Sequence, residues 1–157
     1  YGAQFYPTNL AHKDGYQQVV WTDSTEHKYL EEAGTMNVFF RINDKLVTAP
    51  TSERILDGIT RKSLLQIAKD ANIEVEVRPV TIDEIVEASN KGELKEIFGS
   101  GTAAVISPVS AISYRDTEYV LPEMKDEDKY GVILKQKIME IQYNQETDYP
   151  EWRVEVK

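Results

Sequence analysis

The stretch Phe98-Gly99-Ser100-Gly101-Thr102-Ala103-Ala104-Val105-Ile106-Ser107-Pro108-Val109 joins a segment rich in glycine and hydroxyl residues to a short apolar run. The apolar run has the length and composition of a buried strand. Glycine allows the backbone dihedrals that point successive N–H groups at one spot, and Ser100 and Thr102 add hydroxyl donors there. The stretch predicts an anion cradle at the edge of the core, or else an ordinary tight turn.

Length and composition describe a folded globular chain. Its 157 residues suit one domain, with 41% apolar and 29% charged residues. The net charge of −9 without a basic stripe argues against a nucleic-acid surface. Without cysteine the chain has no disulfide and no thiolate metal site, which fits a reducing compartment. The two histidines, His12 and His27, are isolated, so we expect no metal site.

The boundaries of the chain indicate a piece of a longer protein. It opens on Tyr1 without an initiator methionine. We find no secretory or transit segment and no apolar run long enough to span a membrane.

Hydrophobic periodicity predicts an α+β fold with about six to eight strands. The expected helices are 1–14, 64–70, 81–88, 93–97 and 129–143, and the expected strands are 17–22, 38–42, 45–48, 73–79, 105–109, 112–114 and 118–120. Thr81 to Glu84 forms a capping box at a helix start. Leu134, Ile138 and Ile141 should face the core from the last helix.

Two further features suggest a ligand. Gly58 precedes a helix, and the free N–H groups of a helix start bind phosphate well; the alternative is ordinary capping by Asp57 or Thr60. Glu31 and Glu32 precede a Gly-Thr pair and an aromatic strand. Both could be solvated loop charges, whereas a buried one needs a cation or a hydrogen-bond donor.

Two phosphate cradles and a carboxylate indicate a phosphorylated aromatic cofactor more than a nucleotide. The sequence has no Gly-Lys-Ser/Thr phosphate loop and no strand-linked Gly-x-Gly-x-x-Gly. Pattern and composition alone go no further than this.

Three motifs together resemble the branched-chain amino-acid aminotransferases, which are pyridoxal-phosphate enzymes of fold type IV. The motifs are Glu32-Ala33-Gly34-Thr35-Met36-Asn37, Ile55-Leu56-Asp57-Gly58-Ile59-Thr60-Arg61 and Phe98-Gly99-Ser100-Gly101-Thr102-Ala103-Ala104. The resemblance covers essentially the whole chain, which is similar to the large C-terminal cofactor domain. It implies a pseudo-barrel of mostly antiparallel strands with flanking helices, forming a single cofactor-binding domain over 1–157.

The resemblance also implies a role for each site residue. Glu32 would accept a hydrogen bond from the cofactor's protonated pyridine nitrogen and so strengthen the electron sink, with Glu31 as its solvated neighbour. The remaining cofactor contacts would be Tyr1 at the phenolic oxygen, Leu56 at the ring face, and Ile59, Thr60 and Thr102 at the phosphate. Thr35, Thr102 and Ala103 would line the substrate end.

The chain departs from the family pattern at two places. The lysine that bonds covalently to the cofactor lies a few residues before the position of Tyr1, and Lys13, Lys28, Lys45 and Lys62 do not match it. Because the family's lysine is not in this chain, the chain alone should not catalyse. Side-chain specificity should come mainly from the family's small N-terminal domain, which is missing here, and from a dimer partner. The Cys-x-x-Cys pair of the animal enzymes is replaced by Ala104 and Ser107.

The resulting hypothesis is transamination by the parent protein, from leucine, isoleucine or valine to 2-oxoglutarate. We expect amino-acid and 2-oxo-acid substrates, no nucleic acid or membrane partner, a homodimer or higher homo-oligomer, and a cytoplasmic location. One alternative is another fold type IV enzyme, acting on D-amino acids or a chorismate-derived substrate. The other is a non-catalytic domain that keeps the fold.

Overall fold

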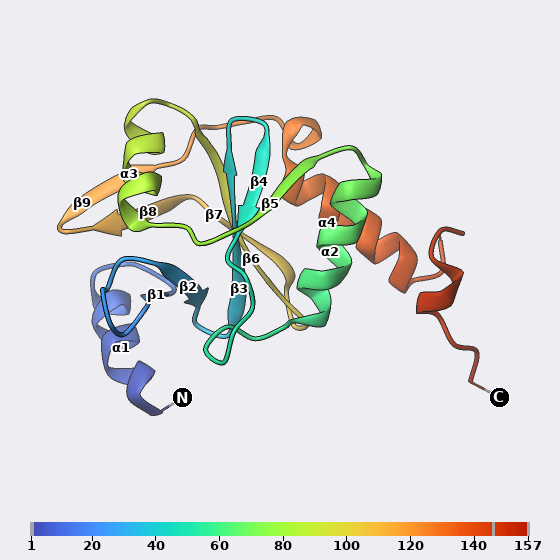
Figure 1. Cartoon of the computed structure of the whole chain (residues 1–157), viewed down its shortest axis with the longest axis horizontal. Helices are drawn as coiled ribbons and strands as arrows, with labels where there is room; N and C mark the ends of the chain where they lie inside the picture. Colours follow the sequence, from blue (N-terminus) through green and yellow to red (C-terminus); the bar gives the residue numbers. More distant parts are fainter. Residues whose placement is uncertain (1, 146, 157) are drawn as a thin grey trace.

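The computed structural model describes residues 2–145 and 147–156. Its centre is a seven-stranded sheet organised around β3 (Met36–Ile42), as Figure 1 shows. The other strands of this sheet are β1 (Val20–Thr22), β2 (Leu30–Ala33), β4 (Lys45–Thr48), β5 (Glu74–Val77), β6 (Leu94–Gly101) and β7 (Val105–Val109). A separate hairpin consists of β8 (Ala111–Tyr114) and β9 (Thr117–Val120).

Strand β3 pairs along both of its edges. Its first residues pair with β2, and its later residues pair with β4. Strand β6 pairs with it from Asn37 to Ile42 and in turn pairs with β7. All pairings are antiparallel except β4 with β5, whose parallel connection runs through a helix. The ends of β2, β3 and β6 therefore meet at one corner of the sheet.

Helices cover the sheet on both faces. The α-helices are α1 (Phe5–Lys13), α2 (Ile59–Asp70), α3 (Ile82–Asn90) and α4 (Tyr130–Gln142). The short 3-10 turns are η1 (Gly2–Gln4), η2 (Asp126–Asp128) and η3 (Pro150–Trp152). Figure 1 shows α2 and α4 side by side, with α3 apart from them. The chain thus forms a helix, sheet, helix arrangement.

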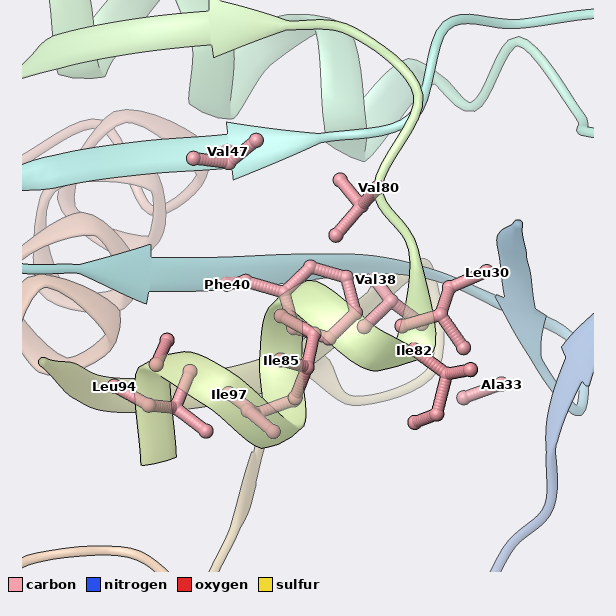
Figure 2. Packing of buried hydrophobic residues seen from close by; sticks show 11 residues of the cluster. Leu30, Ala33, Val38, Phe40, Val47, Val80, Ile82, Ile85, Leu94 and Ile97 are labelled. Atoms are coloured by element: carbon pink, nitrogen blue, oxygen red, sulfur yellow. The ribbon is translucent and has the colours of Figure 1, made fainter. Parts of the chain in front are cut away.

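Alternation along β3 creates two apolar clusters. Val38 and Phe40 pack with Ile85 of α3 in one cluster, which Figure 2 shows. Phe39 packs in the other with Leu64 of α2. Successive side chains of a strand point to opposite faces, so a strand covered on both faces reads as continuous apolar sequence.

Most predicted elements are confirmed. The α+β class, the 45–48 return strand, the two hairpin strands after residue 110 and the last helix are present. Leu134, Ile138 and Ile141 are buried, and Thr81 Oγ1 accepts a hydrogen bond from Glu84 N at 3.1 Å. Strand β1 is shorter than expected, and only Ile106 of β7 is buried.

The predicted helix over 93–97 is wrong, because those residues enter β6. Leu94, Ile97 and Phe98 have helical spacing, but Leu94 and Ile97 face one side of the strand and Phe98 faces the other, and both sides are buried. Strand β2 was also not predicted. With β2 and β6 added to the seven predicted strands, the described chain has nine strands.

The predicted turn at Gly99-Ser100-Gly101 is also wrong. These residues continue β6, and the chain reverses at Thr102–Ala104. Ser100 lies in the ladder between Asn37 and Ile106. A Cβ on Gly99 would lie 3.0 Å from the Met36 sulfur. The glycines at positions 99 and 101 therefore leave room for the Met36 side chain.

Candidate cofactor site

The start of α2 is the strongest anion-binding feature of the site. Gly58 is the N-cap residue, and no side chain caps the helix. The first N–H groups of a helix have no acceptor within it and carry the positive end of the dipole. Asp57 does not cap the helix but pairs with Lys62 Nζ at 2.5 Å. Capping by Asp57 or Thr60 is thus wrong, and the N–H groups of Ile59 and Thr60 remain suitable for a phosphate.

Close packing explains why glycine precedes this helix. A Cβ on Gly58 would lie 2.3 Å from Asn37 Oδ1, which is too close for any real contact. The φ of Gly58 is −61°, so the backbone angle itself suits any residue. The constraint is the approach of β3 to the helix start.

Glu32 lies in β2, directly opposite Asn37 of β3. Its Oε1 accepts from Leu56 N at 2.9 Å and from Asn37 Nδ2 at 3.1 Å. Removal from water raises the pKa of this carboxyl, the Leu56 N–H opposes that rise, and Glu31 adds to it. Within the described part of the chain no cation pairs with Glu32, so its second oxygen could receive a positively charged N–H group.

Glu31 does not behave as predicted. Its side chain is 11% exposed, and it binds Arg54 Nε at 2.7 Å. The expectation of a solvated neighbour is therefore wrong. The two adjacent carboxylates have different surroundings: among the described residues, Glu31 has a guanidinium partner, whereas Glu32 has only neutral hydrogen-bond donors.

Leu56 provides an exposed apolar surface beside this carboxylate. Its side chain is 69% exposed although its backbone is fixed by Glu32. An apolar side chain held rigidly at the edge of a polar site suits the face of a flat ring.

The turns at Thr35 and at Thr102 lie side by side. Thr35 is in the turn between β2 and β3, and Thr102 and Ala103 are in the turn between β6 and β7. A Cβ on Gly101 would lie 3.9 Å from Thr35 O. All three predicted substrate residues are exposed at the same corner as Glu32. Tyr1 lies outside the described residues.

Sequence reasoning missed the roles of Asn37 and Arg54. Asn37 is 5% exposed and connects Glu32 to Leu56 O, which its Nδ2 reaches at 2.9 Å. Counting across the Gly34-Thr35 turn would have placed Asn37 opposite Glu32. Arg54 gave no such signal, because it is 23 residues from Glu31 and reaches it only through the fold.

The residues present fit a phosphorylated pyridine better than a metal. In the described part of the chain, Glu32 has no cation partner and binds the N–H of Leu56, whose side chain is exposed and apolar. The uncapped start of α2 follows two residues later, at Gly58. Among the residues that the structure describes, no cluster of histidine and carboxylate side chains could hold a metal ion. In the same described part, no helix has the length and apolar character to cross a membrane.

The chain is similar in sequence to known proteins. The family model for class IV amino-transferases matches residues 1–112. The probable branched-chain-amino-acid aminotransferase of Staphylococcus epidermidis is 47% identical over 156 residues, covering 99% of this chain and 43% of that protein. The chain thus spans less than half the length of this curated relative.

Solved structures show the same fold. A branched-chain amino acid aminotransferase complexed with N-(5'-phosphopyridoxyl)-L-glutamate superposes with a TM-score of 0.77 at 27% identity, over 96% of this chain and 46% of that one. The enzyme of Thermobaculum terrenum in its PLP-form gives 0.73 at 26% identity, over 92% and 43%. The resemblance to branched-chain aminotransferases is confirmed in sequence and in fold, and the chain belongs to the class IV aminotransferase family.

Proposed function

We propose that the full-length protein containing this chain is a pyridoxal-phosphate-dependent aminotransferase that moves the amino group of leucine, isoleucine or valine to 2-oxoglutarate. The observation that carries this proposal is the Glu32 carboxylate, which has one oxygen held by two donors and, in the described part of the chain, no cation partner. The family and the branched-chain relatives support the reaction class and the substrate class.

In this proposal each site residue of the chain makes a defined contact with the cofactor. Glu32 accepts the pyridine N–H, Leu56 covers one ring face, and the N–H groups of Ile59 and Thr60 bind the phosphate. Thr102 gives the phosphate a second contact. When bound, pyridoxal phosphate withdraws electrons from the substrate so that its Cα proton can leave. A negative Glu32 keeps the pyridine nitrogen protonated and thereby strengthens that effect.

The substrate end is proposed at the two neighbouring turns. Thr35, Thr102 and Ala103 would receive the substrate carboxylate through turn amides and hydroxyls, because such groups suit an anion. Tyr1 would bind the phenolic oxygen of the cofactor. The other half of the protein would supply a small N-terminal domain and the lysine that bonds to the cofactor.

The proposal extends to the assembly and to its location. We expect the chain to form one cofactor-binding domain of a homodimer or higher homo-oligomer that works in the cytoplasm, with amino acids and 2-oxo acids as its partners. The absence of cysteine is consistent with a reducing compartment.

Steady-state kinetics of the full-length protein and of its Glu32→Gln variant test this function. Gln keeps the acceptor for Leu56 N and Asn37 Nδ2 but loses the charge. We expect cofactor binding to be largely retained and kcat to fall about 10²- to 10³-fold. A near-normal kcat in the variant would contradict the role of the charge.

The choice of amino donor tests the substrate class. The wild-type protein should accept leucine, isoleucine and valine with 2-oxoglutarate. Activity on D-alanine but not on leucine would contradict the proposal and favour the D-amino-acid branch of the fold.

A further inference from the structure

Asn37 occupies the centre of the hydrogen-bond network at this corner. It lies in β3, opposite Glu32 of β2 on one edge and opposite Ser100 of β6 on the other. Its side chain is almost completely buried, with the residue 5% exposed. A buried amide needs partners for its hydrogens, and the identity of those partners is informative.

Both hydrogens of the Asn37 amide have acceptors. Nδ2 donates to Glu32 Oε1 at 3.1 Å and to Leu56 O at 2.9 Å. Leu56 N donates to the same Glu32 oxygen at 2.9 Å. The three residues therefore form a closed ring of hydrogen bonds, in which Glu32 Oε1 is already satisfied. Among the described residues Oε2 has no partner, so it is left for a ligand.

The same network reaches the helix start. Leu56 O also accepts from Gly58 N at 2.9 Å. The other atom of the amide, Asn37 Oδ1, lies against Gly58, where a Cβ would be only 2.3 Å away. One side chain thus contacts both the carboxylate and the residue from which α2 begins.

We infer that Asn37 is a positioning residue of the cofactor site, an inference that rests on the proposed function. It orients the Glu32 carboxylate so that Oε2 faces the pyridine nitrogen. It also fixes the separation between that carboxylate and the N–H groups that bind the phosphate. Asn37 acts through Glu32 and Leu56 and does not touch the reacting atoms.

A double-mutant cycle on the full-length holoenzyme tests whether Asn37 acts through Glu32. We expect Asn37→Ala to lower kcat about 10- to 100-fold with little change in the KM for leucine, as loss of an orienting partner does elsewhere. In the Glu32→Gln background the same substitution should lower kcat by less than about 2-fold, because the charge it orients is gone. Equal losses in both backgrounds would overturn the inference.

The Asn37→Asp variant gives a second readout that does not require a truncated side chain. Two carboxyl groups this close share one proton, which they hold with a raised pKa, and a protonated carboxyl at position 37 is again a donor toward Glu32. We expect the activity of this variant, relative to the wild type, to rise as the pH is lowered. A ratio independent of pH would overturn the donor role.

A signal from the cofactor itself completes the test. With ¹⁵N-labelled pyridoxal phosphate, the ring-nitrogen shift should move toward the neutral value in Asn37→Ala. The matched control is Thr48→Val, which removes another buried hydrogen bond, from Thr48 Oγ1 to Val38 O at 2.7 Å, without contacting Glu32. Its ring-nitrogen shift and its kcat should match the wild type, and a shift equal to that of Asn37→Ala would overturn the inference.

These outcomes are separable from failure of the proposed function. If the wild-type protein binds no pyridoxal phosphate or transfers no amino group, the function fails. If the wild type is active and Asn37→Ala is as active as the wild type, the function stands and the positioning role is wrong.

Discussion

The two oxygens of Glu32 have different surroundings, and this difference explains the chemistry that we assign to it. Donors from Leu56 and Asn37 hold Oε1, while burial raises the pKa of the carboxyl. A pyridinium at Oε2 would supply the cation that the carboxylate lacks in the described part of the chain. The sequence motif identified Glu32, but only the hydrogen bonds of the folded chain show which oxygen is available.

Gly58→Ala tests the close packing at residue scale. The new methyl group would meet Asn37 Oδ1, a side chain that is fixed by two hydrogen bonds. We expect the free energy of unfolding to fall by about 1 to 3 kcal/mol and the affinity for pyridoxal phosphate to drop. Urea unfolding and cofactor titration measure both effects.

The control for this variant is Gly2→Ala. In the described part of the chain, no heavy atom outside its two neighbours lies within 4 Å of a Cβ at that position. Its stability and cofactor affinity should match the wild type. A Gly58→Ala protein as stable as this control would contradict the packing argument.

At the scale of elements, α4 begins on a partly buried carboxylate. Glu96 of β6 accepts from Tyr130 N at 2.7 Å and Gly131 N at 3.0 Å, and it pairs with Arg41 Nη1 at 3.0 Å. The Arg41 guanidinium also stacks on the Tyr130 ring at 3.7 Å. An acidic group is favourable at a helix start, so this cluster anchors α4 on the sheet.

Removing that carboxylate should loosen α4. In Glu96→Ala two N–H groups lose their acceptor, and Arg41 loses one partner while it keeps Asp128 O and Asp44, so the free energy of unfolding should fall by about 1 to 3 kcal/mol. Chemical denaturation measures it, with Glu127→Ala as the control, because that side chain is 74% exposed. Equal stabilities of the two variants would contradict the anchoring role.

The connection between β1 and β2 is organised by Asp23, which is 5% exposed. Its carboxylate accepts from Thr25 N, Glu26 N, Lys28 N and Tyr29 N. These N–H groups hold the pKa of Asp23 well below its usual value of 3.8. The stabilisation is therefore complete above that usual value and is lost as the pH falls below it.

Asp23→Asn should therefore be less stable than the wild type near neutral pH, and the difference should shrink as the pH falls below about 4. Urea midpoints measured across that range give the comparison. Asp44→Asn, whose side chain is 92% exposed, is the control. A difference between Asp23→Asn and the wild type that stays constant with pH would show that the charge of Asp23 has no part in it.

The same elements show what local sequence can predict. The capping residue Thr81 and the apolar spacing of the last helix are local features of the sequence. The helices α3 and α4 were therefore predicted correctly. Residues 94–98 have helical spacing but form a strand, because helices cover both of its faces. The cover comes from α2, α3 and α4, which are distant in sequence. Such long-range packing overrides the helical spacing of apolar residues in the local sequence.

At the scale of the whole molecule, the site is built where sequence-distant segments meet. β2, β3, the loop before α2 and the β6–β7 turn each contribute to one corner. The family motifs located these contributors, whereas the hydrogen bond from Asn37 to Leu56 O and the pairing of Arg54 with Glu31 are seen only in the fold. Of the lysines considered from sequence, Lys45 pairs with Glu74 and Glu76, and Lys62 pairs with Asp57. Neither is suited to a covalent cofactor bond.

A crystal structure of the full-length protein with pyridoxal phosphate tests the central claim most directly. We predict the pyridine nitrogen within hydrogen-bond distance of Glu32 Oε2, and the phosphate on the N–H groups of Ile59 and Thr60. The cofactor should be bonded to a lysine outside residues 1–157. A cofactor whose phosphate lies away from the start of α2, or whose ring nitrogen does not contact Glu32, would contradict the account.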